Sequence, residues 1–186
     1  FKKKSYLIIS EAIPPYLASF LTGYFLLKRR VVGAFLDSRY ISPFVTEWGT
    51  WTDKQVPKTY SQYADIAMEN LLQMTRPLME QKTGLKLVPT YSYARIYKRG
   101  DILPRHKDRE ACEISTTLFL GGIPWPIFIE PNSKKGKETV HGYISSNTKG
   151  LKVILKPGDM LIYKGCELEH WREAFQGAYC VQVFLH

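Results

Sequence analysis

The chain has 186 residues, of which 45% are hydrophobic and 23% charged, with a formal net charge of +9. This length suits a single domain, residues 1–186, and the apolar content excludes an intrinsically disordered chain. The positive charge favours an anionic partner such as nucleic acid, a membrane surface or an acidic metabolite, although it could also serve solubility alone. Lys and Arg are scattered along the chain, so no single basic segment identifies such a partner.

The number and spacing of the cysteines indicate the redox state of the cellular compartment. Cys112, Cys166 and Cys180 are odd in number and far apart, and none forms a CxxC pair. This usage argues against a disulfide scaffold or a zinc ribbon and favours a reducing compartment, so we expect a cytoplasmic location without a signal peptide. Residues 12–27 carry no charge, but this stretch is interrupted by Pro and Gly and is too short to span a bilayer. No membrane partner is therefore expected.

The first 86 residues predict helices that support a sheet. Residues 6–9, Tyr-Leu-Ile-Ile, form an apolar run typical of a short strand. Residues 12–27 predict a buried helix, because Pro14 and Pro15 suit a first turn. We expect this helix to end at the three cations of residues 28–30, where positive charge favours the C-terminal end of the helix dipole.

Residues 59–82 predict a second helix. Apolar side chains recur there with the period of one helix face, at Tyr63, Ile66, Ala67, Leu71, Met74 and Leu78. Pro77 is expected to kink or restart this helix, and Gly84 to end it. The intervening residues 37–58 predict a loop, whose two Trp side chains are expected to cover the core rather than contact a substrate.

From residue 87 onward the sequence changes to short β-rich runs separated by Gly and Pro. These runs cover residues 90–98, 114–120, 126–130, 140–144, 151–155, 160–163 and 179–185. Short strands with turns between them indicate a sandwich or barrel. Because the helices precede the strands, the predicted fold class is α+β, with an antiparallel core over residues 87–186.

The candidate chemistry centres on His106-Lys-Asp108. Residues two apart on a strand point the same way, so this imidazole and carboxylate can converge on one point. A second imidazole, His170, follows a Pro-Gly-Asp turn and a predicted strand, which would deliver it to the end of that strand. Two His and one carboxylate bind one face of an ion and leave the other open, as in non-haem Fe(II) sites. We predict that these three residues bind one metal ion.

The strand at residues 91–99 alternates in chemistry. Its odd positions carry Tyr, Tyr, Arg, Tyr and Arg, whereas Ala94 and Ile96 are small and apolar. If the odd face looks into a barrel, Arg95 and Tyr97 line a polar cavity beside the metal residues; otherwise that face is a solvated edge. We favour the cavity, because a Gly-Asp turn leads the chain directly to His106.

Together these segments resemble the Fe(II)/2-oxoglutarate-dependent dioxygenases, most closely the prolyl-4-hydroxylase-like branch. The resemblance covers about half the chain and includes Arg95-Ile-Tyr97-x-x-Gly100, His106-x-Asp108, residues 114–121, Pro157-Gly-Asp159 and His170. It implies a double-stranded β-helix, or jelly roll, flanked by N-terminal helices. It further implies Fe(II), 2-oxoglutarate and O2 as cofactor and co-substrates. His106, Asp108 and His170 would be the ligands, and Tyr97 would hydrogen-bond the 2-oxoglutarate.

One position departs from the family pattern. The family usually places an Arg or Lys shortly after the second His to bind the 2-oxoglutarate carboxylate, whereas residues 177–182 here read Gly-Ala-Tyr-Cys-Val-Gln. A buried carboxylate needs a cationic or multi-donor partner. Arg172 and Arg95 are nearly equal candidates for that role and Lys164 is a third, although each could instead form a structural or surface ion pair.

Three functions remain open from the sequence. The first is an Fe(II)/2-oxoglutarate hydroxylase that acts on a C–H bond of a protein, peptide or small molecule. The second is a non-catalytic jelly-roll binding module, which the unusual residues 177–182 favour. The third is a nucleic-acid-modifying oxygenase, which the basic charge favours but no nucleic-acid-binding motif supports.

Overall fold

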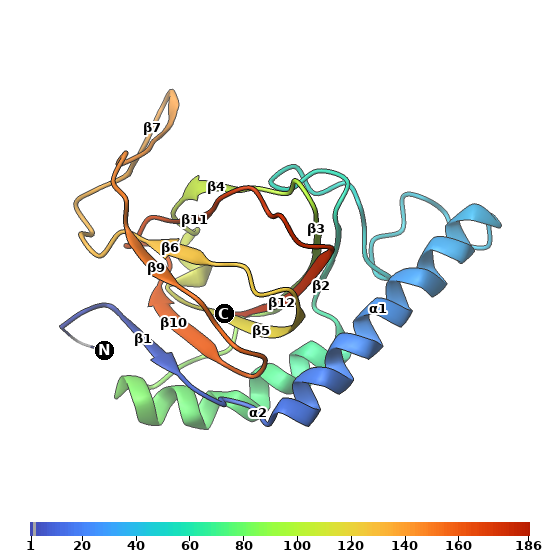
Figure 1. The fold of residues 1–186 in the computed structure, drawn as a ribbon, viewed down its shortest axis with the longest axis horizontal. Coiled ribbons are helices and arrows are strands. Elements are labelled where there is room, and N and C mark those ends of the chain that lie inside the picture. The colour runs from blue at the N-terminus through green and yellow to red at the C-terminus, as the bar shows by residue number, and fades with distance from the viewer. Residues whose placement is uncertain (2) are drawn as a thin grey trace.

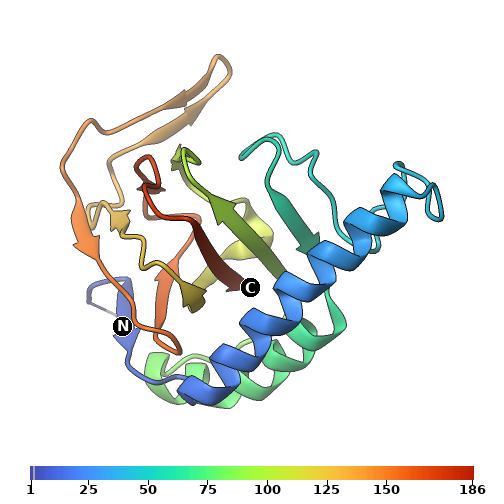
Figure 2. The same ribbon diagram turned by 45° about the vertical axis from the view of Figure 1, so that its right-hand side comes forward.

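A computed structural model describes residue 1 and residues 3–186, whose strands surround a common interior with two helices outside (Figure 1). One antiparallel sheet has the order β1 (Tyr6–Ile9), β10 (Met160–Lys164), β5 (Ile114–Gly122), β12 (Tyr179–Leu185), β3 (Ser92–Lys98) and β2 (Tyr60–Tyr63). A second has the order β4 (Leu103–His106), β11 (His170–Arg172), β6 (Ile127–Ile129) and β9 (Leu151–Val153). A separate hairpin, β7 (Lys137–Thr139) and β8 (Gly142–Ile144), projects from the molecule (Figure 2). A single 3-10 turn, Glu110–Cys112, precedes β5.

Both helices pack on the outer face of the six-stranded sheet. Helix α1 spans Pro15–Asp37, and α2 spans Ile66–Thr83. Asp65 caps α2 by accepting hydrogen bonds from the amides of its first turn, and Gly84 ends it in the left-handed conformation, with φ of 69°. Among the described residues, no helix is both long and apolar enough to cross a membrane.

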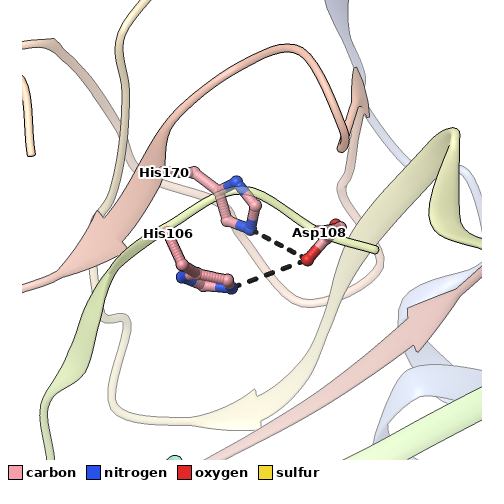
Figure 3. A group of neighbouring side chains, drawn as sticks. All are labelled: His106, Asp108 and His170. Atoms are coloured by element: carbon pink, nitrogen blue, oxygen red, sulfur yellow. Dashed lines mark ion pairs between the residues drawn. The ribbon is translucent and has the colours of Figure 1, made fainter. Parts of the chain in front are cut away.

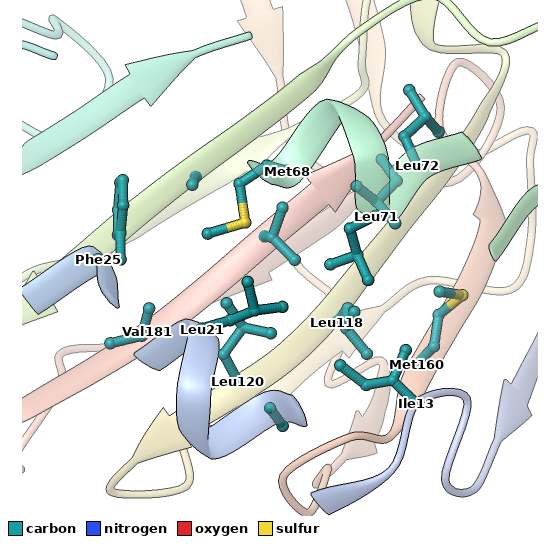
Figure 4. Packing of buried hydrophobic residues seen from close by; sticks show 14 of the residues in the cluster. Ile13, Leu21, Phe25, Met68, Leu71, Leu72, Leu118, Leu120, Met160 and Val181 are labelled. Carbon is teal, nitrogen blue, oxygen red and sulfur yellow. The ribbon is translucent and has the colours of Figure 1, made fainter. Parts of the chain in front are cut away.

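The alternation of side chains along each strand creates two separate apolar clusters. On the outer face, residues of α1 and α2 pack against alternate residues of β3, β5, β10 and β12, including Phe25, Met68, Leu118 and Met160 (Figure 4). The intervening residues, such as Phe119, point into the space between the two sheets and pack against the smaller sheet. The predicted facing antiparallel sheets are therefore confirmed, and so is the position of the helices outside one of them.

The N-terminal boundaries differ from the sequence expectation. Residues 60–63 form an edge strand rather than the first turn of a helix, because their backbone pairs with β3. Helix α1 continues to Asp37, well past the cations at residues 28–30. Lys28 lies within this helix and bonds to Asp65 at 2.5 Å, so its charge ties α1 to the start of α2. Pro77 lies inside α2, which the structure assigns as one continuous helix.

Candidate metal centre

His106, Asp108 and His170 lie together although they come from two segments that are far apart in the sequence. Antiparallel pairing of β4 and β11 sets His106 directly opposite His170. Asp108 follows β4, and its amide donates to the carbonyl of Gly165 at 2.9 Å. One carboxylate oxygen lies 3.5 Å from the Nε2 atom of each imidazole (Figure 3). The potential ligand atoms are all within 4.8 Å of one another, which is the convergence that the sequence predicted.

Backbone carbonyls fix which nitrogen of each imidazole faces the cluster. His106 Nδ1 lies 2.7 Å from the carbonyl oxygen of Pro104, and His170 Nδ1 lies 3.0 Å from that of Leu168. A carbonyl can only accept, so each Nδ1 must carry the proton, and each Nε2 presents a lone pair to the site. This is the orientation that an imidazole needs to bind a metal ion.

The electrostatic environment favours an ionised Asp108 and a neutral His106. Burial lowers the pKa of His106, and the neighbouring His170 lowers it further. Burial would raise the pKa of Asp108, but the charge interaction with His170, followed by its other interactions within the cluster, holds it well below its ordinary value. The hydroxyl of Ser115 also donates to Asp108 at 2.6 Å. Asp108 and His106 therefore favour the protonation states that binding a divalent cation requires.

A cavity of about 410 Å³ opens onto these three residues. Its wall includes the odd face of residues 91–97, namely Tyr91, Tyr93, Arg95 and Tyr97. Ala94 and Ile96 lie instead in the outer core beneath the helices. The prediction that the odd face lines a polar cavity is thus confirmed for these four residues, whereas Arg99 lies exposed in the turn after β3.

Arg95 and Arg172 are both buried, but their partners differ. Arg95 donates to the hydroxyls of Tyr93 at 3.0 Å and Tyr97 at 3.4 Å, and its Nη2 forms an ion pair with Asp53 at 3.0 Å. As predicted, one guanidinium therefore points into the cavity beside Tyr97. Its charge is already matched by a carboxylate.

Arg172 reaches from β11 across the interior to the opposite sheet. It donates to the hydroxyl of Thr117 at 3.1 Å and to the carbonyl of Trp125. Its side chain is 1% exposed, its Nε has no hydrogen-bond partner, and no carboxylate pairs with it in the described part of the chain. Burial lowers its pKa. Lys164, the third candidate, forms a partly exposed ion pair with Glu167. Of the three candidates, Arg95 lines the cavity, whereas Arg172 and Lys164 do not.

Two residues of the 37–58 loop reach the cavity without having been predicted to do so. Asp53 accepts from Tyr93 at 2.6 Å, and Gln55 lies 3.3 Å from Arg95 and 3.1 Å from the Nε2 of His106. Trp51, by contrast, packs against Tyr60 in the outer core, as expected, whereas Trp48 is exposed and does not belong to that core. The sequence carried no local signal for Asp53 and Gln55, because only the folded loop brings them to the site.

Comparisons with known proteins locate this architecture among solved structures. The sequence matches no protein-family model and no curated protein. A prolyl-4-hydroxylase from Pseudomonas putida superposes with a TM-score of 0.60 over 99% of this chain and 92% of its own, at 15% identity. HygX from Streptomyces hygroscopicus, solved with nickel and 2-oxoglutarate, gives 0.67 over 100% and 83%, at 11% identity.

A third similar structure contains iron. The epimerase SnoN, in complex with Fe3+, α-ketoglutarate and nogalamycin RO, gives a TM-score of 0.65 over 99% of this chain and 78% of its own, at 12% identity. Identities this low establish architecture rather than activity. The chain therefore shares the fold of the Pseudomonas prolyl-4-hydroxylase, HygX and SnoN.

Proposed function

We propose that this chain is an Fe(II)- and 2-oxoglutarate-dependent oxygenase of the prolyl-4-hydroxylase-like branch, built on a double-stranded β-helix. Its reaction would be hydroxylation of an unactivated C–H bond in a protein, peptide or small molecule. The observation that carries the proposal is the convergence of His106, Asp108 and His170 on one point inside a cavity. The nickel and 2-oxoglutarate in HygX and the Fe3+ and α-ketoglutarate in SnoN support it.

The residues present fit an Fe(II) ion. Two neutral imidazoles and one carboxylate are the donor set of non-haem iron sites, and the ligand atoms of all three residues lie within 4.8 Å of one another. When bound, Fe(II) with 2-oxoglutarate and O2 supplies the oxidising chemistry, which side chains alone lack. The protein's part is to hold the ligands in place, to orient the co-substrate and to restrict water.

Arg172 is the residue that fits the distal carboxylate of 2-oxoglutarate best. A buried guanidinium without a carboxylate partner is costly, because its desolvation is not offset by an opposite charge. Its unpartnered Nε has a hydrogen bond still to donate. An incoming carboxylate would supply both the charge and the acceptor. Tyr97, fully buried beside it, would add a hydroxyl donor, whereas Arg95 already has Asp53.

The outer part of the cavity would receive the substrate. Tyr63 and Tyr91 stack there with ring centroids 4.3 Å apart, and the guanidinium of Arg109 lies 5.0 Å from the Tyr91 ring. Lys107 adds a second cation to the lining. Aromatic faces and cations can bind either a peptide or a polar small molecule, so these contacts do not choose between the two.

Anaerobic titration tests the proposal directly. Fe(II) is added to the protein, followed by 2-oxoglutarate, and the visible spectrum is recorded. We expect a weak charge-transfer band that requires both additions and is lost in the His170→Ala variant. In air, slow consumption of 2-oxoglutarate without substrate should follow, and stimulation by peptides, small molecules or oligonucleotides would then separate the substrate classes.

Two results would contradict the proposal. Binding of Fe(II) without any response to 2-oxoglutarate would favour the non-catalytic binding module. Stimulation by oligonucleotides alone would retain the cofactors but replace the proposed substrate with nucleic acid.

A further inference from the structure

A charged pair lies behind the two imidazoles. Arg105 immediately precedes His106, and Glu169 immediately precedes His170. Because successive side chains on a strand alternate in direction, these two residues project away from the metal cluster. Arg105 Nη1 lies 3.3 Å from Glu169 Oε2, and the Glu169 side chain is fully buried. The two segments that carry the imidazoles are thus joined by an ion pair on the opposite side.

Arg105 also stacks on Trp171, which directly follows the predicted metal ligand His170. Its guanidinium carbon lies 3.4 Å from the centroid of the Trp171 ring, directly after His170, and its Nη2 donates to the carbonyl of Thr148 at 2.6 Å. A planar guanidinium can stack and donate in two directions at once, which a Lys ammonium cannot do. Arg105 therefore fixes residues on both sides of His170.

The same pair anchors the projecting hairpin. We define the arm as residues 131–148, which include β7 and β8 and extend from the body of the molecule (Figures 1 and 2). At its end, the amide of Ser146 donates to Glu169 at 3.0 Å, and its hydroxyl donates to the same carboxylate. At its start, the carbonyl of Ser133 accepts from Lys107 at 2.9 Å. Both ends of the arm are therefore tied to residues adjacent to the metal cluster.

The backbone alone holds the imidazoles less firmly. Pairing between β4 and β11 shifts register between His170 and Arg172, so the regular ladder is interrupted where the ligand lies. We propose that Arg105 and Glu169 are positioning residues: they set the separation of the two imidazoles and couple metal binding to the anchoring of the arm. This inference rests on the proposed metal-binding function. It extends that function by assigning the arm a stability that depends on the metal.

The test is Ni2+ titration of the purified protein, followed by limited trypsin digestion. Glu169→Gln keeps the size of the side chain but removes its charge, and should weaken Ni2+ binding by about 10–100-fold, the usual effect of losing a group that orients a ligand. Ni2+ should slow cleavage at the exposed lysines of the wild-type arm, but much less in the variant. Arg105→Gln should reproduce both effects, and its partly exposed side chain makes it the safer variant for folding.

Asp101→Asn is the matched control. Asp101 is a buried carboxylate that pairs with Lys98 and accepts from Thr59 at 2.7 Å, but it does not line the cavity. This variant should bind Ni2+ as the wild type does. If it loses as much affinity as Glu169→Gln, the effect is general destabilisation and the proposal is overturned.

The remaining outcomes separate this inference from the proposed function. A wild-type protein that binds no Ni2+ overturns both. A wild-type protein that binds Ni2+ and 2-oxoglutarate, with an Arg105→Gln variant of equal affinity and equal arm protection, overturns only the positioning role. If circular dichroism shows that Glu169→Gln does not fold, the Arg105→Gln variant alone tests the positioning role.

Discussion

The two faces of the six-stranded sheet perform different tasks. Its outer face packs against α1 and α2 through aliphatic and aromatic side chains, such as Ala94 and Ile96 of β3. The neighbouring residues of the same strand, Arg95 and Tyr97, face the interior and line the cavity. A shift of one residue in register would exchange these roles, so the alternation of β3 fixes both stability and chemistry.

This division explains how the interior can hold so many polar groups. Buried charges such as Arg172 and Arg95 stabilise a fold weakly at best, because desolvation opposes their interactions. The continuous apolar packing on the outer face has no such cost and supplies favourable burial. We therefore expect substitutions on the inner face to alter ligand binding, and those on the outer face to alter the free energy of unfolding.

The largest expected effect is loss of the metal on the inner face. Asp108→Ala removes the only carboxylate of the cluster described here, so it should abolish Ni2+ binding at concentrations that saturate the wild type. Isothermal titration calorimetry measures this directly. Glu110→Ala, at an exposed acidic residue nearby, is the control and should bind normally. Saturable binding by Asp108→Ala with unchanged affinity would contradict the assigned ligand set.

The second effect belongs to the outer face. Phe25 of α1 is fully buried, and its ring centroid lies 5.2 Å from that of Tyr60. Phe25→Ala should lower the free energy of unfolding by about 3–5 kcal/mol in urea titrations, because it leaves a cavity. Phe20, on the same helix, is 69% exposed, so Phe20→Ala should change stability by less than about 0.5 kcal/mol. Ni2+ affinity of the folded Phe25 variant should remain that of the wild type, and a loss there would break the division between the faces.

The sequence was most informative where a local pattern coincides with a structural constraint. Alternation along residues 91–97 identified which face of β3 is polar, and His106-x-Asp108 identified two of the three clustered residues. Gly84 ended α2 as expected, because few other residues adopt its left-handed conformation without strain. These features depend on a few neighbouring residues, so they can be recognised without knowledge of the fold.

The features that the sequence did not predict depend on distant contacts. Residues 60–63 fit a helical period but form a strand, because the edge of β3 offers backbone partners that outweigh local preference. Gln55 reaches His106 only through the folded loop. Likewise, the ion pair between Arg105 and Glu169 joins residues that are far apart in the chain. No pattern within one segment could have indicated these contacts.

The third effect distinguishes the two buried arginines of the interior. Arg172→Gln should weaken 2-oxoglutarate binding to the Ni2+-loaded protein by about 2–4 kcal/mol, the scale of losing one partner of a buried charge pair. Ni2+ binding itself should be unaffected, because Arg172 does not contact the metal cluster. Arg95→Gln is the matched control, since that guanidinium already pairs with Asp53. If Arg95→Gln loses the co-substrate and Arg172→Gln retains it, the two roles must be exchanged.

The smallest effect is the response of the inner face to pH. Burial and His170 lower the pKa of His106 below its ordinary value of 6.5, so its neutral form persists to lower pH than in the unfolded chain. Ni2+ needs that neutral form, so competition by a proton at His106 should not weaken its affinity as the pH falls through 6.5, and should do so by about tenfold per pH unit only below the lowered pKa. The pKa of His106 is lower in the folded protein than in the unfolded chain, so the unfolded chain binds the proton more readily. The metal-free fold should therefore lose stability as the pH falls below 6.5. Calorimetric titrations across this range, with imidazole NMR resonances of the metal-free protein, measure both. A His106 imidazole resonance that titrates at the ordinary value of 6.5 would show that burial does not hold this residue neutral.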